Sequence, residues 1–326
     1  MKEAFRDRYG PPEVVGLREV PVPVPAEGEV LVRVRAASVN RADLDALKPK
    51  PSLVRLYLGV RAPRDHSVGG DVAGVVETVG AGVTRFKPGD EVFGDMFAAR
   101  GGAFVDYVCA AEKFFEPMPP GTSFDEAATL PHSAILALQA MRLRTGRAVK
   151  AGDRVLIVGA SGNVGPFAVQ IAKAMGAEVT GMASAGKLDL VRSLGADHVL
   201  DYAKVNPIRA SERYDWIVDM DSYLPLLSVR RALRPNGAYV TLGGTNRTIL
   251  AGVVVGPLIS IFSDKWTGLM LWWKPWNPPD VATLKELIAA GKLKAVIDRR
   301  YPLVEIVDAL RYVDEGRARG KVVITF

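Results

Sequence analysis

The sequence contains few of the residues that build metal centres and disulfides. Cys109 is the only cysteine among 326 residues, and there are three histidines. An intrachain disulfide and a cysteine-rich metal site are therefore excluded. His66, His132 and His198 stand far apart in the sequence and do not show the spacing of metal ligands.

Long charged and long apolar segments are also missing. The net charge of +6 is spread along the chain without a basic run of five, and we find no nucleic-acid motif. Residues 1–10 are charged and contain no apolar signal core. The apolar stretch 249–262 is broken by Pro257 and is too short to span a bilayer. We therefore expect a cytoplasmic protein that binds no nucleic acid and has no membrane span.

The sequence does contain a strand, a glycine-rich turn and a helix in succession. Residues 155–158 are apolar and β-branched, as in a buried parallel strand. Gly159, Gly162 and Gly165 follow, and residues 166–175 show helical spacing of apolar side chains. Such a turn lets the backbone approach a pyrophosphate, with the amides at the helix start directed at it. Taken alone, the spacing also fits a tight connection that binds no ligand, which is the less favoured alternative.

The strand predicted next, at 178–182, favours a particular dinucleotide. About twenty residues after the turn, an NAD site places an acid on the ribose hydroxyl. Here no Asp or Glu stands at that position, and Ser184 and Lys187 follow the strand instead. A hydroxyl and a cation suit the 2′-phosphate of NADP, which a carboxylate would repel. We therefore predict NADP as the cofactor, with a solvated surface lysine as the alternative interpretation of Lys187.

Two patterns divide the chain. Residues 1–120 contain many short strands separated by Gly and Pro turns, which predicts a small barrel-like domain. Residues 121–275 alternate strands with helices, which is typical of a doubly wound parallel sheet. Residues 276–326 contain two predicted helices and a final strand, and we expect this tail to return to the first domain. The strands predicted in the alternating part are 154–158, 178–182, 198–201, 215–219 and 237–242, and the helices are 166–175, 187–194 and 223–233.

The order of these parts resembles the medium-chain dehydrogenase/reductase superfamily. The segments that carry the resemblance are 69–76, 86–92, 101–104, 155–165, 191–197 and 319–324. The resemblance covers essentially the whole chain. It implies an α/β fold, with a GroES-like β-rich catalytic domain formed by residues 1–120 and 276–326 and a Rossmann dinucleotide-binding domain formed by residues 121–275.

Zinc-dependent members of this family carry residues that the chain lacks. They have a catalytic cysteine where this chain has Asn40, and His-Glu where it has Gly70 and Asp71. They also insert a four-cysteine zinc loop around 95–110. Because zinc needs three or four His, Cys or carboxylate ligands, the chain resembles the zinc-lacking, quinone oxidoreductase-like branch. Hydride transfer to a quinone or an enone creates delocalised charge, which hydrogen-bond donors stabilise without a metal.

The resemblance also assigns candidate site residues. Asn40 and Asp43 border the nicotinamide and are the candidate catalytic residues, although such side chains also satisfy turns and helix starts. Tyr202 matches a position that lines the adenosine phosphate, with an ordinary strand-end aromatic as the alternative. His132 and Ser133 lie where a family helix approaches the nicotinamide, and a buried structural histidine is the favoured interpretation of His132. The candidate cofactor-binding residues are Gly159, Ser161, Gly162, Asn163, Val164, Gly165, Ser184, Lys187, Tyr202, Gly243 and Gly244.

We therefore predict an NADPH-dependent, zinc-independent oxidoreductase that delivers hydride to quinones or α,β-unsaturated carbonyl compounds. The alternatives are a zinc-free NADP-dependent alcohol dehydrogenase and a nucleotide-binding regulatory protein without turnover. We interpret the apolar stretch 249–262, with the tryptophans that follow it, as the subunit interface of a homodimer or as a lipophilic lid. Peripheral membrane contact is a third interpretation of this stretch.

Overall fold

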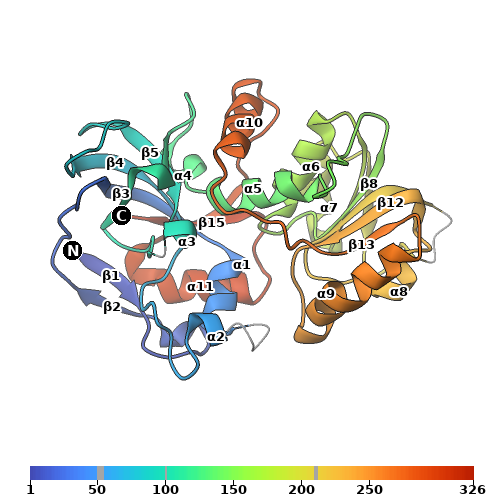
Figure 1. Cartoon of the computed structure of the whole chain (residues 1–326), viewed down its shortest axis with the longest axis horizontal. Helices are drawn as coiled ribbons and strands as arrows, with labels where there is room; N and C mark the ends of the chain where they lie inside the picture. Colours follow the sequence, from blue (N-terminus) through green and yellow to red (C-terminus); the bar gives the residue numbers. More distant parts are fainter. Residues whose placement is uncertain (50–54, 100, 209–211) are drawn as a thin grey trace. The chain divides into compact units, whose positions relative to one another are not determined.

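The computed structural model describes residues 1–49, 55–99, 101–208 and 212–326, which form two compact units. The elements carry the labels of Figure 1. Each unit is built around its own large sheet. The first unit contains Met1–Ile135, Pro275–Ala289 and Lys294–Phe326, and the second contains Leu136–Lys274 and Ala290–Leu293.

Within the described residues, the first unit contains a seven-stranded sheet in the order β14-β15-β3-β4-β5-β7, with β6 also paired to β3. Neighbours are antiparallel except β14 and β15, which are parallel. The long strand β3 pairs with three others, and its register follows from one buried face that includes Val30, Val32 and Val34. The strands are β3 (Glu29–Val39), β4 (Asp71–Val79), β5 (Glu91–Asp95), β6 (Tyr107–Ala111), β7 (Phe115–Pro117), β14 (Ile297–Pro302) and β15 (Lys321–Thr325).

Short helices and a two-stranded sheet complete the first unit. Helix α11 buries Ile306, Leu310 and Val313, spaced three and four residues apart, and packs on α1, β3 and β15. Helix α5 (Pro131–Ala140) begins in the first unit and ends in the second. The other elements are β1 (Lys2–Phe5), η1 (Pro12–Val14), β2 (Gly16–Glu19), α1 (Arg41–Leu47), α2 (Arg55–Leu58), α3 (Met96–Ala99), η3 (Glu112–Phe114), α4 (Phe124–Ala127), α10 (Pro278–Ala289), η5 (Leu303–Glu305) and α11 (Ile306–Asp314).

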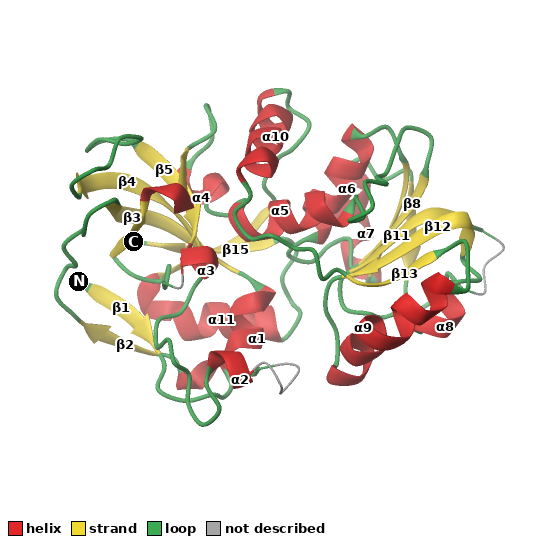
Figure 2. Ribbon diagram, in the orientation of Figure 1, coloured by secondary structure: helices red, strands yellow, loops and turns green. Residues whose placement is uncertain are grey.

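The second unit contains a parallel sheet whose described strands follow the order β10-β9-β8-β11-β12-β13. The strand order reverses between β8 and β11. Helices α6 and α7 pack on β8, β9 and β10, whereas α9 packs on β13 (Figure 2). The elements are β8 (Arg154–Val158), α6 (Gly165–Ala174), β9 (Glu178–Ala183), η4 (Ala185–Lys187), α7 (Leu188–Ser193), β10 (His198–Asp201), β11 (Tyr214–Asp219), α8 (Leu226–Val229), β12 (Leu233–Thr241), α9 (Asn246–Ile261) and β13 (Trp266–Leu269).

Part of the second unit differs from the pattern predicted from the sequence. The helix predicted at 223–233 was wrong in extent: only α8 is helical, because Leu233 already pairs in β12 and the segment before α8 is held by a buried carboxylate. The apolar stretch 249–262 forms most of α9 despite Pro257. Strand β13 follows at the sheet edge and was not predicted; its sequence, Trp-Thr-Gly-Leu, includes a glycine, which is uncommon in strands.

Candidate functional site

The glycine-rich turn after β8 has two positions that only glycine fits. Gly159 has a backbone φ of +83°, in the left-handed region. A Cβ on Gly165 would lie 2.2 Å from the carbonyl oxygen of Gly159. The first and third glycines are therefore required by the turn itself, whether or not a ligand binds.

Gly162 is different, because the turn does not need it. A Cβ at this position would meet only the Gly159 carbonyl oxygen, at 3.6 Å, which is an ordinary van der Waals contact. Glycine here keeps the backbone bare at the start of α6. A bare backbone next to a helix N-terminus is what a dinucleotide's diphosphate needs for close approach. The turn thus fits a dinucleotide cofactor.

The ends of β9 and β10 bring the next candidates together. Ala183 and Asp201 are register partners at these two ends, and Ser184 and Tyr202 are the residues that follow them. Lys187 closes the short 3-10 turn that begins after Ser184. The first acid beyond β9 is Asp189, whose side chain is 98% exposed and pairs with Arg192. The structure therefore places a hydroxyl, and not a carboxylate, directly after β9.

Gly243 and Gly244 follow β12 and lie against the loop after β11. A Cβ on Gly244 would come within 2.9 Å of the Asp221 carbonyl oxygen, and Gly244 has φ +136°. A Cβ on Gly243 would lie 3.2 Å from the Met220 carbonyl oxygen. These glycines allow the two loops to approach closely at the carboxyl edge of the sheet.

Asp219, at the end of β11, is a residue that the sequence analysis missed. Its buried carboxylate accepts hydrogen bonds from the backbone amides of Tyr223 and Leu224 at 3.0 and 2.8 Å, and from the Tyr239 hydroxyl at 3.0 Å. Burial raises the pKa of this carboxyl. The hydrogen bonds act in the opposite direction and lower it. Asp219 holds the loop after β11 in place. The available signal was an acid at the end of an apolar strand, which alone is too common to use.

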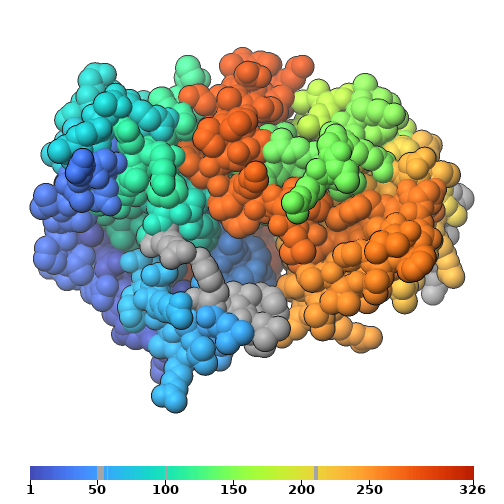
Figure 3. Space-filling model, viewed as in Figure 1, coloured from blue at the N-terminus to red at the C-terminus, as the bar shows by residue number. Residues whose placement is uncertain are grey.

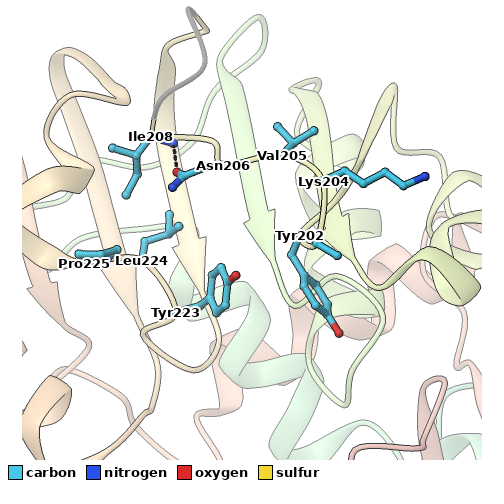
Figure 4. Close-up of a pocket in the computed structure, with 9 residues that line it drawn as sticks. Tyr202, Lys204, Val205, Asn206, Ile208, Tyr223, Leu224 and Pro225 are labelled. Atoms are coloured by element: carbon cyan, nitrogen blue, oxygen red, sulfur yellow. Dashed lines mark hydrogen bonds between the residues drawn. The ribbon is translucent and has the colours of Figure 1, made fainter.

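A pocket of about 430 Å³ lies at this edge of the second unit (Figure 4). The rings of Tyr202 and Tyr223 are 6.0 Å apart between centroids and are both about half exposed. Asn206 accepts a hydrogen bond from the Ile208 amide at 3.0 Å, drawn as the dashed line. Leu224 and Pro225 supply part of the apolar lining.

All candidate cofactor residues of the sequence analysis therefore lie in the second unit, at the carboxyl ends of parallel strands. That edge, at the point where strand order reverses, is where open α/β sheets bind ligands. Gly159, Ser161, Gly162, Asn163, Val164 and Gly165 follow β8, Ser184 and Lys187 follow β9, Tyr202 follows β10, and Gly243 and Gly244 follow β12.

The first unit contains a buried polar cluster centred on Asp71. Oδ2 of Asp71 accepts hydrogen bonds from the Ser38 hydroxyl at 3.0 Å and from Asn40 Nδ2 at 2.9 Å. Oδ1 accepts from the backbone amide of His132, at the start of α5, at 3.0 Å. The Lys321 ammonium lies 3.5 Å from Oδ2. These groups come from the end of β3 and the residue after it, and from β4, α5 and β15, which are separated in the sequence.

Both candidate catalytic residues are part of this region, and both are 1% exposed. Asn40 directly precedes α1, and its backbone amide donates to Asp43 Oδ2 at 2.7 Å. The Asn40 carboxamide oxygen accepts from the Ser133 hydroxyl at 3.0 Å and from the Lys321 ammonium. The structure thus gives Asn40 and Asp43 the local helix-start role and joins Asn40 to Ser133, which the sequence analysis had also singled out.

Burial shifts the proton affinities of this region. It raises the pKa of Asp43 to about 8, an effect that neighbouring Asp71 reinforces. The pKa of Asp95, which stands opposite Asp71 on β5, rises to about 7, again mainly through burial. Burial lowers the pKa of His132 to about 4, so its ring is neutral near pH 7. Burial likewise lowers the pKa of Lys321, whereas the negative charge of Asp71 raises it.

Lys321 is the second residue that the sequence analysis missed. It stands at the start of β15 and is 1% exposed, with its ammonium also 3.0 Å from the Ser133 hydroxyl. The segment 319–324 was used for the family resemblance, but its lysine was given no role. The available signal was a charged residue at the start of an apolar run, which does not by itself show that the side chain is buried.

Comparison with known proteins agrees with the fold and with these motifs. A family model described as alcohol dehydrogenase GroES-like domain matches residues 26–120, and one described as zinc-binding dehydrogenase matches residues 194–324. The NAD(P)H oxidoreductase RTN4IP1, mitochondrial, of Bos taurus is 32% identical over 98% of this chain and 87% of its own length. The chloroplastic quinone-oxidoreductase QR1 of Triphysaria versicolor is 32% identical over 99% of this chain and 98% of its own length. The solved quinone oxidoreductase from Coxiella burnetii has a TM-score of 0.86 and 28% identity, covering 100% of this chain and 99% of its own.

The chain belongs to the medium-chain dehydrogenase/reductase superfamily, in its quinone oxidoreductase-like branch. It is an oxidoreductase with a GroES-like domain and a parallel-sheet Rossmann domain, and its relatives imply a nicotinamide cofactor. Across the described ranges, no three or more His, Cys, Asp or Glu side chains are grouped so as to hold a metal ion. No helix in the described part of the chain is both long and apolar enough to cross a membrane.

Proposed function

We propose that the protein is an NADPH-dependent reductase that transfers hydride to quinones or α,β-unsaturated carbonyl compounds without zinc. The observation that carries this proposal is the cluster of Asn40, Asp71, Ser133 and Lys321. Zinc-dependent relatives have cysteine at the position of Asn40 and His-Glu at Gly70 and Asp71. Here the polar atoms of Asn40 and Asp71 are bonded within the cluster, and an amide and an ammonium are not zinc ligands.

The substrate class follows from the chemistry that such a cluster permits. A nicotinamide cofactor, when bound, supplies the hydride. On an enone the hydride adds to the β-carbon, the carbon–carbon π electrons shift towards oxygen, and a proton then completes the saturated ketone. On a quinone the product is the hydroquinone. In both cases the negative charge is delocalised, so hydrogen-bond donors are sufficient to stabilise it. The names of the relatives given above support the quinone class.

The site residues of this proposal divide between the two ends of the cofactor. Asn40 and Asp43 serve the reacting end, where Asp43 holds a proton near neutral pH because burial raises its pKa to about 8. Ser184, Lys187 and Tyr202 bind the 2′-phosphate of NADP, since no acid directly follows β9. The bare backbone at Gly162 accepts the diphosphate.

We further propose a cytoplasmic homodimer joined through α9, beside the last strand of the sheet, β13. Strand β13 ends the sheet among the described strands, and α9 lies along its outer edge, where the Ser260 hydroxyl bonds both the backbone amide and the carbonyl oxygen of Thr267. Helix α9 exposes Val254, Leu258 and Ile261 by 50%, 52% and 71%. Figure 3 shows this segment, in orange, at the surface. An exposed apolar stripe on a helix at the edge of a sheet is typical of a subunit interface.

The experiment that tests the activity is oxidation of NADPH in the presence of a panel of quinones and enones. We expect turnover with members of the panel, and none with simple ketones. Oxidation of simple alcohols with NADP as the preferred reaction would favour the alcohol dehydrogenase. Tight NADPH binding without turnover on any compound would favour the regulatory protein and overturn the proposal.

A further inference from the structure

We propose that Lys321 is a positioning residue for the reaction: its buried ammonium fixes the orientation of the Asn40 carboxamide and the Ser133 hydroxyl. This inference rests on the proposed function, because it takes Asn40 to act at the reacting end of the site. Lys321 itself touches neither substrate nor cofactor in this assignment.

The argument begins with the Asn40 carboxamide, which has a donor end and an acceptor end of nearly equal size. An ammonium only donates hydrogen bonds, and a carboxylate only accepts them. Lys321 therefore requires the oxygen of Asn40 on its side, and Asp71 requires Nδ2 on the other, at 2.9 Å. A flipped carboxamide would place its NH₂ against the ammonium and its oxygen against the carboxylate.

Ser133 is oriented by the same ammonium. Lys321 donates to the Ser133 hydroxyl oxygen at 3.0 Å, and that hydroxyl donates to the Asn40 oxygen at 3.0 Å. The hydroxyl proton therefore points to Asn40. With Lys321 replaced by an apolar side chain, the Ser133 hydroxyl would lose the donor that orients it, and Asp71 alone would hold the Asn40 carboxamide.

The cluster also balances its charges. Asp71 bonds the first turn of α5 through the His132 amide, and the Lys321 ammonium is 3.5 Å from the same carboxylate. Both charged side chains are at most 1% exposed. Removing one charge leaves the other buried and unpaired, which destabilises a fold strongly. A test of positioning must therefore separate loss of stability from loss of orientation.

The first test uses two hydroxyls of the same cluster. Ser133→Ala removes contacts to Asn40 and to Lys321, whereas Ser38→Ala removes a contact of equal length, 3.0 Å, to Asp71 alone. We expect the urea midpoint to fall in both variants, but a kcat at least tenfold lower only for Ser133→Ala, with the NADPH Kd unchanged in both. Equal effects of both variants on kcat would overturn the proposal.

The second test restores the charge balance without restoring orientation. Lys321→Met should lower both the urea midpoint and kcat, and the double variant Lys321→Met/Asp71→Asn should recover the midpoint while kcat stays at least tenfold low. Recovery of kcat together with the midpoint would show that Lys321 acts only through stability, and would overturn the proposal.

The third readout does not depend on turnover. The readout is the NMR spectrum of protein labelled with ¹⁵N on asparagine. The side-chain amide signals of Asn40 are assigned by their loss in Asn40→Ala. In the double variant and in Ser133→Ala, these signals should shift, and their amide protons should exchange with water faster. They should stay unchanged in Ser38→Ala. Unchanged Asn40 signals in the double variant would overturn the positioning role. A wild-type protein without turnover would instead overturn the proposed function, with this readout still deciding whether Lys321 orients Asn40.

Discussion

Gly162 allows the cofactor site to be tested without disturbing the fold. Because a Cβ there meets only ordinary contacts, Gly162→Ala should fold with an unchanged Tm. Gly162→Asp should also fold, but its carboxylate would stand where the diphosphate binds, so we expect NADPH binding to be abolished in calorimetry. Gly165→Ala should lower the Tm, because its Cβ would lie 2.2 Å from a carbonyl oxygen. Unchanged NADPH affinity in Gly162→Asp would place the site elsewhere.

Lys187 tests the choice between the two dinucleotides. A lysine contact to the 2′-phosphate is worth about 1.5–3 kcal/mol, which is roughly tenfold to hundredfold in affinity. Lys187→Ala should therefore weaken NADPH by that factor and leave NADH nearly unchanged, and added salt should reduce the preference of the wild type. Lys187→Glu should weaken NADPH further.

The matched control for this prediction is Lys150→Ala. Lys150 is exposed and precedes β8, so it lies at the amino edge of the sheet, opposite the predicted site. It should leave both affinities unchanged. Equal affinity of the wild type for NADH and NADPH at low salt would contradict the assignment of the phosphate pocket.

The pKa of Asp43 predicts a pH dependence of stability. The folded protein holds this proton up to about pH 8, whereas the unfolded chain releases it near pH 3.8. Between these values the folded state binds the extra proton, so the contribution of Asp43 to stability falls as pH rises, by about 1.4 kcal/mol per pH unit. Asp43→Asn removes this dependence and keeps an acceptor for the Asn40 amide. Its free energy of unfolding should therefore fall less steeply than that of the wild type between pH 5 and 8.

The control is Asp189→Asn, because the Asp189 side chain is 98% exposed. Urea titrations of the three proteins at several pH values measure the slopes. Asp189→Asn should follow the wild type. If Asp43→Asn also followed it, the Asp43 carboxyl would be ionised in the folded protein near neutral pH.

At the scale of elements, helix α9 carries the prediction of a homodimer. Leu258→Asp introduces a charge into the exposed apolar stripe, and burying that charge in an interface is costly. We expect this variant to be monomeric in light scattering, with its fold intact. Val24→Asp is the matched control, because Val24 is 87% exposed in the other unit. It should leave the dimer unchanged, and a monomeric wild type would remove the proposed interface.

At the scale of the whole molecule, zinc independence is the property to measure. Although one matching family model is described as zinc-binding dehydrogenase, the chain has an amide and a buried carboxylate bonded to each other at the corresponding positions. We expect elemental analysis to find no stoichiometric zinc, and dialysis against a chelator to leave NADPH oxidation unchanged. A stoichiometric metal, or activity lost to the chelator and restored by zinc, would contradict the proposal.

The sequence alone determined the architecture, because local patterns carry it. The apolar run of β8 and the glycines that follow specify a strand, a turn and a helix, and the predicted bounds 154–158 and 198–201 agree with β8 and β10. The family and the fold predicted from these local motifs were confirmed. The spacing of such motifs is kept between relatives in which most residues differ. The choice of NADP and the roles of the site residues remain predictions.

Only the tertiary structure decided what the buried polar residues do. Lys321 lies 281 positions from Asn40 in the sequence, yet its ammonium bonds the Asn40 carboxamide. Asp219 closes a loop that the helical pattern at 223–233 had concealed. Such partners meet because β15 pairs with β3 and β11 with β12. A hydrogen bond depends on distance in space, which no pattern of neighbouring residues encodes when the partners lie on different strands.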